Sequence, residues 1–100
     1  MIEISKKIDR INDLCQEHQV EQLYLFGSAV TDSFDEEKSD VDFLVKFKSF
    51  ELKEYFKNYI SLKQKLKSLF KKEIDLVEEQ TLKNPYLIQS IEKSKRLVYG

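Results

Sequence analysis

The connection between two apolar segments, residues 23–26 and 41–47, constrains the fold of this chain more than any other feature. Both segments are predicted to be strands, and a Gly-Ser turn and a polar loop separate them. An ordinary parallel crossover contains a full helix, and this connection is too short to hold one. We therefore expect an α+β fold in which a small mixed sheet packs against helices, and not a doubly wound parallel sheet.

The remaining elements follow from periodicity and capping. Apolar residues at helical spacing predict helices over residues 2–18 and 52–70. Asn84-Pro85 predicts the start of a third helix that runs to about Ser94. In the second helix, an aromatic stripe (Tyr55, Phe56 and Tyr59) is most simply core, with a partner interface as the alternative. The other predicted segments are a helical turn at 28–31, a polar loop at 32–39, a strand at 73–77, and a short strand or packed tail at 97–99.

Composition limits the class of protein. The 100 residues include 41% apolar residues and carry a net charge of −1. We therefore expect a single globular domain over residues 1–100, without strong direct binding to nucleic acid. No apolar run approaches the ~20 residues of a membrane span, and the N-terminus has no secretory pattern. The one cysteine, Cys15, lies on the apolar stripe of the first helix, and a buried, reduced thiol favours a cytoplasmic location.

Two aspartates open the strand at 41–47 and indicate its chemistry. Side chains alternate between the two faces of a strand, so Asp40 and Asp42 share one face while Val41, Phe43 and Val45 share the other. Two carboxylates on one face repel each other, and burial makes that repulsion more costly. A bound divalent cation removes it, and Mg²⁺ prefers such oxygen ligands and often holds substrate phosphates as well.

A third aspartate can join this pair. In the strand at 73–77, Ile74 and Leu76 suit the core face, so Asp75 lies on the opposite face together with Glu73. If this strand neighbours the one at 41–47, three carboxylates converge and can hold two Mg²⁺ ions ~3.5–4 Å apart, as in phosphoryl or nucleotidyl transfer. An acidic sheet edge is the alternative for Asp75.

The Gly27-Ser28 turn fits the phosphate end of such a site. Glycine lets the backbone approach a ligand closely. The serine hydroxyl and the first amides of a helical turn can donate hydrogen bonds to phosphate oxygens. A strand that ends in Gly-Ser is a weak signal alone, but it becomes strong when Asp-x-Asp and a later strand aspartate follow it.

With these motifs in place, the sequence resembles the MNT-type (minimal) nucleotidyltransferases of the DNA polymerase β superfamily. Their pattern is Gly-Ser, a short loop, Asp-x-Asp-hydrophobic and a third Asp, here Gly27, Ser28, Asp40, Asp42 and Asp75. The resemblance covers nearly the whole chain, including the tail NPYLIQSIEKSKRLVYG.

The resemblance implies a polymerase β-like nucleotidyltransferase fold, two Mg²⁺ ions and ATP as substrate. It also implies that the three aspartates are the catalytic and metal-holding residues and that Gly27 and Ser28 bind the nucleotide. Many such proteins are antitoxins paired with a HEPN-domain RNase, and some transfer AMP to a tyrosine of that toxin.

Two functions therefore remain open. The chain is either an enzyme that transfers AMP to a hydroxyl of a HEPN-domain partner, or an inactive antitoxin that acts by binding. Family members often read Gly-Ser-x-Ala-Arg-Gly, whereas Thr31 and Asp32 stand in place of the Arg-Gly pair here. The replacement removes an arginine that would bind phosphate, which favours the inactive antitoxin. The retained carboxylates favour the active enzyme. Transfer to a small molecule would require an additional substrate domain, for which 100 residues leave no room.

Other charged residues are assigned milder roles. The acidic residues at 32–37 are expected to form a solvated loop, and the lysines of the helix at 52–70 a solvated face. His18 is expected to be a surface or capping residue and not a general base. Lys46 shares the Asp42 face by parity and is a candidate phosphate contact.

Overall fold

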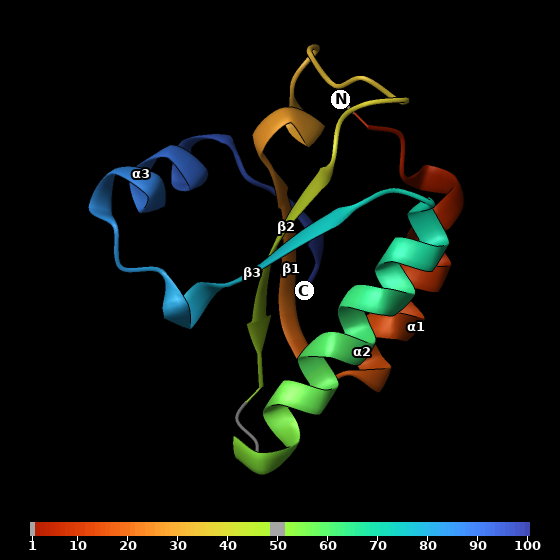
Figure 1. Ribbon diagram of the computed structural model, residues 1–100, viewed down its shortest axis with the longest axis vertical. Coiled ribbons are helices and arrows are strands. Elements are labelled where there is room, and N and C mark those ends of the chain that lie inside the picture. Colours follow the sequence, from red (N-terminus) through yellow and green to blue (C-terminus); the bar gives the residue numbers. More distant parts are fainter. Residues whose placement is uncertain (1, 49–51) are drawn as a thin grey trace.

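The structure is a computed structural model that describes residues 2–48 and 52–100 (Figure 1). Within these residues, four strands form one sheet in the order β3-β2-β1-β4. The strands are β1 (Val20–Phe26), β2 (Val41–Phe47), β3 (Ile74–Glu78) and β4 (Arg96–Tyr99). The helices are α1 (Ile8–Glu17), α2 (Leu52–Phe70) and α3 (Pro85–Ser94), and short 3₁₀ turns are η1 (Ser5–Lys7), η2 (Gly27–Val30) and η3 (Glu79–Thr81).

The sheet is mixed, as the short connection between its first two strands predicted. Strand β1 pairs antiparallel with both β2 and β4. Strand β2 pairs in parallel with β3, and α2 makes the crossover between them. The expected α+β fold is therefore confirmed.

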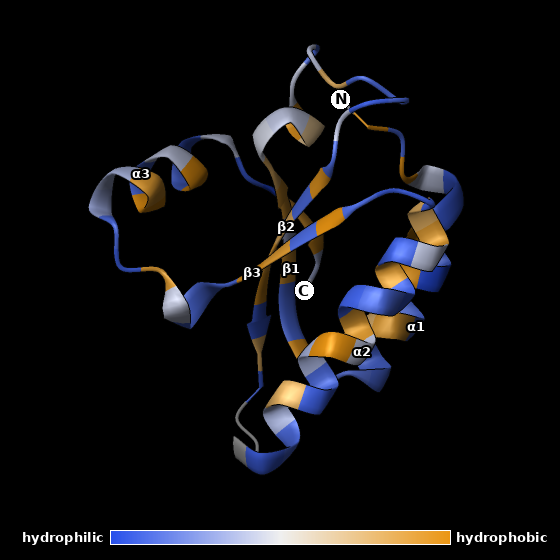
Figure 2. Ribbon diagram, viewed as in Figure 1, coloured by the Kyte–Doolittle hydropathy of each residue, from blue (hydrophilic) through white to orange (hydrophobic). Residues whose placement is uncertain are grey.

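Helices α1 and α2 cover one face of the sheet (Figure 1). Val41, Phe43 and Val45 point into that layer from β2 and are fully buried. Their partners from the helices lie on apolar stripes that Figure 2 shows turned toward the sheet. Cys15 is buried there, and burial raises the pKa of its thiol to about 12, so the thiol is unreactive. Phe56 departs from the predicted core stripe: it is 69% exposed.

Helix α3 lies on the other side of the sheet from α1 and α2 (Figure 1). Its predicted start is confirmed, because the Asn84 side chain accepts hydrogen bonds from the Tyr86 and Leu87 amides and Pro85 begins the helix. Ile91 is its buried residue, and Leu44 of β2 is buried on the sheet face that α3 covers. This helix and the strand residues beneath it therefore form a second, smaller layer.

Some element boundaries differ from those predicted. Helix α1 begins at Ile8, not at Ile2, because the Ile2 amide donates to the Ala29 carbonyl oxygen (2.8 Å). This contact holds the N-terminal segment against η2. Strand β1 begins at residue 20, three residues before the predicted 23, and β3 covers 74–78 and not 73–77. Residues 97–99 belong to a strand, β4. No helix in the described part of the chain has the length and apolar character to cross a membrane.

His18 was predicted to be either a surface residue or a capping residue. It is the C-cap residue of α1, but it is buried and not on the surface. Its ring is buried, with Nδ1 2.7 Å from the Leu14 carbonyl oxygen and Nε2 3.0 Å from Ser61 Oγ. The Asn58 amide also donates to the His18 carbonyl oxygen (2.6 Å). These bonds fasten the end of α1 to the middle of α2, so the imidazole has a structural role.

Candidate active site on the sheet face opposite α1 and α2

Gly27 presses against one of the predicted aspartates. Strand β1 ends at Phe26, which is paired with Asp42 on β2. Gly27 follows with φ +65°, and a Cβ atom placed on it would collide with Asp42 Oδ2. A side chain at this position would therefore be both strained and in the way of the carboxylate. The glycine allows the turn after β1 to pass directly over Asp42.

The next residues fold back on themselves in η2. The Thr31 hydroxyl and amide both donate to the Ser28 carbonyl oxygen, at 3.0 and 3.1 Å. Thr31, one of the two residues that replace Arg-Gly of the family pattern, therefore caps the turn. Its side chain is too short and too engaged locally to substitute for an arginine that reaches a phosphate.

Asp75 lies next to Asp42. The two residues are register partners in the parallel pair β2–β3, and aligned residues on neighbouring strands project from the same face. Ile74 and Leu76 are buried on the other face, while Asp75 is exposed. Strands β2 and β3 are thus neighbours, which was the condition for Asp75 to lie beside Asp42.

The three aspartates form a zone of negative charge. The pKa of Asp42 is raised to about 6, chiefly by burial and further by the charges of Asp75 and Asp40. Asp42 is half-buried, whereas the other two are exposed. Repulsion of this kind is what a bound cation relieves, and three carboxylates are suitable ligands for a hard cation such as Mg²⁺.

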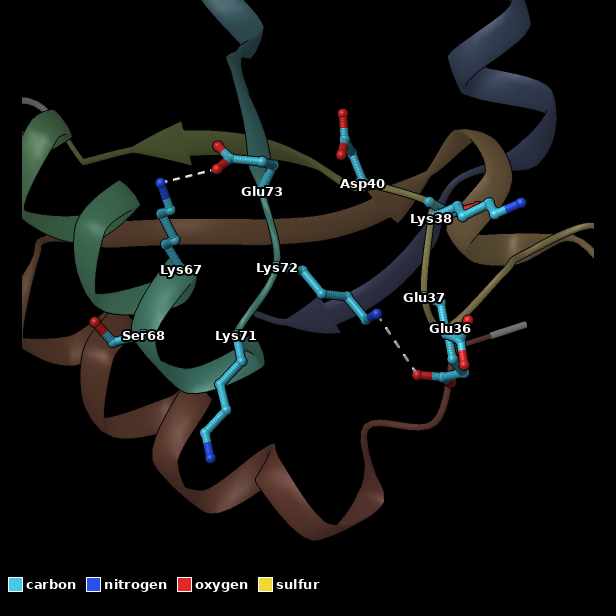
Figure 3. A pocket seen from close by; sticks show the side chains of 10 residues that line it. Glu36, Glu37, Lys38, Asp40, Lys67, Ser68, Lys71, Lys72 and Glu73 are labelled. Carbon is cyan, nitrogen blue, oxygen red and sulfur yellow. Dashed lines mark ion pairs between the residues drawn. The ribbon is translucent and has the colours of Figure 1, made fainter.

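The side chains as they stand do not form a closed metal cage. Across residues 2–48 and 52–100, no three His, Cys, Asp or Glu side chains are grouped closely enough to hold a metal ion. Figure 3 shows Asp40 extending away from the lysines nearby. Because Asp40 and Asp75 are exposed, their side chains are free to change rotamer. Carboxylate oxygens are donors of the kind that a hard cation takes, but the observed side-chain positions do not bring the three carboxylates together around one point.

Tyr59 supports the strand that carries Asp75, a role that the helical pattern did not predict. Strand β3 lies at the edge of the sheet, and its Glu73 carbonyl oxygen accepts from the Val41 amide of β2 (3.0 Å). Carbonyls alternate in direction along a strand, so that of Leu76 points outward, and the Tyr59 hydroxyl donates to it. Burial and the charge of Asp75 raise the pKa of this tyrosine. Spacing placed Tyr59 among core residues but could not locate its hydroxyl.

A charged groove of about 680 Å³ opens beside Asp40 (Figure 3). The loop before β2 forms one wall, and the end of α2 with the residues after it forms the other. Lys67 pairs with Glu73 (2.9 Å), and Lys72 pairs with Glu36 (3.9 Å). The acidic residues of the loop are exposed, as predicted, and Glu36 also pairs with Lys72 of the segment that leads into β3.

Lys46 lies at the opposite end of β2 from this groove. It shares the Asp42 face by alternation, but it lies four residues further along β2, ~13 Å away at the usual rise of a strand. Its ammonium group is 3.7 Å from Glu21 Oε2. Lys46 is thus separate from the carboxylates, and the structure does not bring it to them.

Known proteins are similar to this chain in sequence and in fold. A family model described as "Nucleotidyltransferase domain" matches residues 8–98. A protein of Methanocaldococcus jannaschii with the name "Putative protein adenylyltransferase MJ0128" is 34% identical over 102 residues, which cover 94% of this chain and 98% of that protein.

Two solved structures extend the comparison. One is described as "Structure of putative minimal nucleotidyltransferase"; it is 25% identical, with a TM-score of 0.75 and coverage of 93% of this chain and 90% of that one. The other contains a tri-AMPylated Shewanella oneidensis HEPN toxin in complex with an MNT antitoxin. It is 23% identical, with a TM-score of 0.63 and coverage of 93% of this chain and 69% of that one. The matches confirm the fold and the resemblance to minimal nucleotidyltransferases that the motifs indicated.

Proposed function

This chain belongs to the nucleotidyltransferase domain family, and from that premise we propose that it transfers AMP from ATP to a hydroxyl group of a partner protein. The observation that carries the proposal is the convergence of Asp42 and Asp75, in register on adjacent strands, beneath the Gly27 turn. This combination provides oxygen ligands for cations next to a turn whose glycine allows a phosphate chain to approach the backbone closely.

In this proposal Asp40, Asp42 and Asp75 hold two Mg²⁺ ions, and Gly27 and Ser28 bind the triphosphate. Bound Mg²⁺ would neutralise phosphate charge and lower the pKa of the acceptor hydroxyl. The chain itself positions the reactants. Half-buried Asp42 provides a rigid ligand at the centre, and exposed Asp40 and Asp75 have the rotamer freedom to close around the cations.

The proposed acceptor is a protein of the HEPN class. The Methanocaldococcus jannaschii relative is named for protein adenylylation, and the Shewanella oneidensis complex contains an AMPylated HEPN toxin with its MNT antitoxin. The groove beside Asp40 gives a polar entry for an acceptor segment, with Lys38, Lys67, Lys71 and Lys72 along it. The buried single cysteine, Cys15, suits action in a reducing cytoplasm.

A second candidate function is neutralisation of the partner by binding alone. It is favoured by Thr31, which caps η2 through the Ser28 carbonyl in the place where an arginine would extend toward a phosphate. A site with the carboxylates but without this cation would bind the triphosphate more weakly.

One experiment separates the two candidates. The chain is incubated with its HEPN-domain partner, ATP and Mg²⁺, and the intact mass of the partner is measured. A gain of one or more AMP groups that disappears with Asp42→Asn supports the enzyme. Asp13→Asn is the matched control, because Asp13 is exposed on α1, on the far side of the sheet from the site. Tight complex formation and neutralisation without a mass gain would replace the enzyme with the binding-only antitoxin.

A further inference from the structure

A small cavity of about 170 Å³ lies between α3 and the sheet, on the face that carries Asp42. Leu44 forms part of it, and alternation puts Leu44 on the same face as Asp42, two residues or ~7 Å further along β2. The lining residues are Leu44, Glu79, Leu82, Ile88, Ile91 and Glu92. The cavity is thus mostly apolar, with two carboxylates, and it lies next to the proposed catalytic centre.

One of these carboxylates is incompletely satisfied. Among the described residues, Glu79 Oε2 is the one buried side-chain oxygen or nitrogen without a hydrogen-bond partner. Glu92, which lines the cavity from α3, differs because its Oε1 accepts from Lys95 Nζ at 2.8 Å. A buried acceptor without a donor is costly and rare in folded proteins. The structure therefore leaves an unused hydrogen-bond acceptor on the wall of an apolar cavity.

We propose that this cavity is the nucleobase subsite and that it takes adenine, whose exocyclic amine donates to Glu79 Oε2. This inference rests on the proposed function. At ~30 Å³ per water the cavity corresponds to roughly six waters, enough for one heterocyclic ring system. Leu44, Leu82 and Ile88 supply the apolar walls against which such a ring packs.

The cavity lies at a distance from Asp42 that suits the length of a nucleotide. Gly27, the residue after β1, adjoins Asp42, and Leu44 lies two residues beyond Asp42 on β2. With the phosphates between the turn and the aspartates, the ribose bridges the distance from Asp42 to the cavity. Adenine, guanine and cytosine each carry one exocyclic amine that can donate to this acceptor, whereas uracil and hypoxanthine carry none. The choice of adenine among the three follows from ATP as the proposed substrate.

The test compares ATP with purine riboside triphosphate, which lacks only that amine. Each is titrated into the protein with Mg²⁺ by calorimetry. The wild-type chain should bind ATP roughly 10-fold or more tightly, the effect of a hydrogen bond to a charged group. Glu79→Ala should bind both alike, and Glu92→Ala, the matched control, should keep the preference.

The outcomes distinguish this inference from the function on which it rests. Equal affinity of the wild-type chain for the two nucleotides overturns the adenine subsite while leaving nucleotide binding intact. Absence of binding by either nucleotide overturns the proposed function and the subsite together. If Glu79→Ala does not fold, as judged by circular dichroism, the comparison of the two nucleotides on the wild-type chain still decides.

Discussion

Replacing Asp42 with asparagine should stabilise the metal-free protein at neutral pH while removing its proposed activity. The pKa of Asp42 is raised from 3.8 to about 6 by burial and by Asp75 and Asp40. Because the folded state holds the proton more tightly than the unfolded state, the ionised carboxylate destabilises the fold above pH 6. Asparagine has a similar shape and carries no charge, so it removes this destabilisation.

The size of the effect follows from the pKa. The difference between 3.8 and about 6 corresponds to about 3 kcal/mol in the free energy of unfolding, at 1.36 kcal/mol per unit. Asp42 is only half-buried, and solvent screening reduces such values strongly, so the expected gain is about 1 kcal/mol. For a domain of this size that gain raises Tm by ~4–8 °C.

The pH dependence provides the sharper check. Between pH 6 and about pH 4 the folded state of the wild-type chain binds more protons, so the penalty from Asp42 disappears as the pH falls. The advantage of Asp42→Asn should therefore be largest at pH 7 and close to zero at pH 4.

Urea denaturation with a chelator present, at pH 7 and pH 4, measures both values. Asp13→Asn on α1 serves as the control for a general change in net charge. A loss of stability in Asp42→Asn at pH 7, or an equal gain at both pH values, would refute the argument that burial and the neighbouring carboxylates raise the Asp42 pKa. The same variant should show no stabilisation by ATP with Mg²⁺, whereas the wild-type chain should.

Three further predictions test other parts of the site and fold. Gly27→Ala should lower stability by ~1–2 kcal/mol because of its positive φ, and more through collision with Asp42; an unchanged Tm would contradict the close approach. Tyr59→Phe should cost ~1 kcal/mol in urea denaturation by leaving the outward Leu76 carbonyl without its donor, and no change would mean that water replaces the hydroxyl without loss. Asn84→Ala should cost ~1 kcal/mol but Asn84→Gly only a few tenths, and equal costs would argue against the side-chain cap.

Elements governed by local pattern were predicted closely. The bounds of β2 and α2 match the prediction, because alternation and helical spacing of apolar residues fix which side faces the core. The start of α3 matches because Asn84-Pro85 satisfies and shapes a helix N-terminus within a few residues. The shared face of Asp40 and Asp42 required nothing beyond the period of a strand.

Boundaries set by distant contacts were missed. The amide of Ile2 donates to the carbonyl oxygen of Ala29, 27 residues away, so the first residues of the predicted helix pack against η2 and α1 begins only at Ile8. His18 is buried because Ser61 of α2 meets its ring, and no local pattern around residue 18 contains that partner. Phe56 keeps helical spacing with core residues, yet α2 turns it to solvent.

In the candidate site, too, some features follow from local sequence and others from contacts between distant residues. Residue types, spacing and the family resemblance grouped Gly27, Ser28, Asp40, Asp42 and Asp75 as candidates. The faces on which the three aspartates lie followed from local strand periodicity. Their proximity depended on the parallel pairing of β2 with β3, which α2 makes possible by crossing over the core. The raised pKa of Asp42 and the unpartnered oxygen of Glu79 arise from neighbours brought together through space. Electrostatic and hydrogen-bonding environments depend on those distances, and a linear pattern does not contain them.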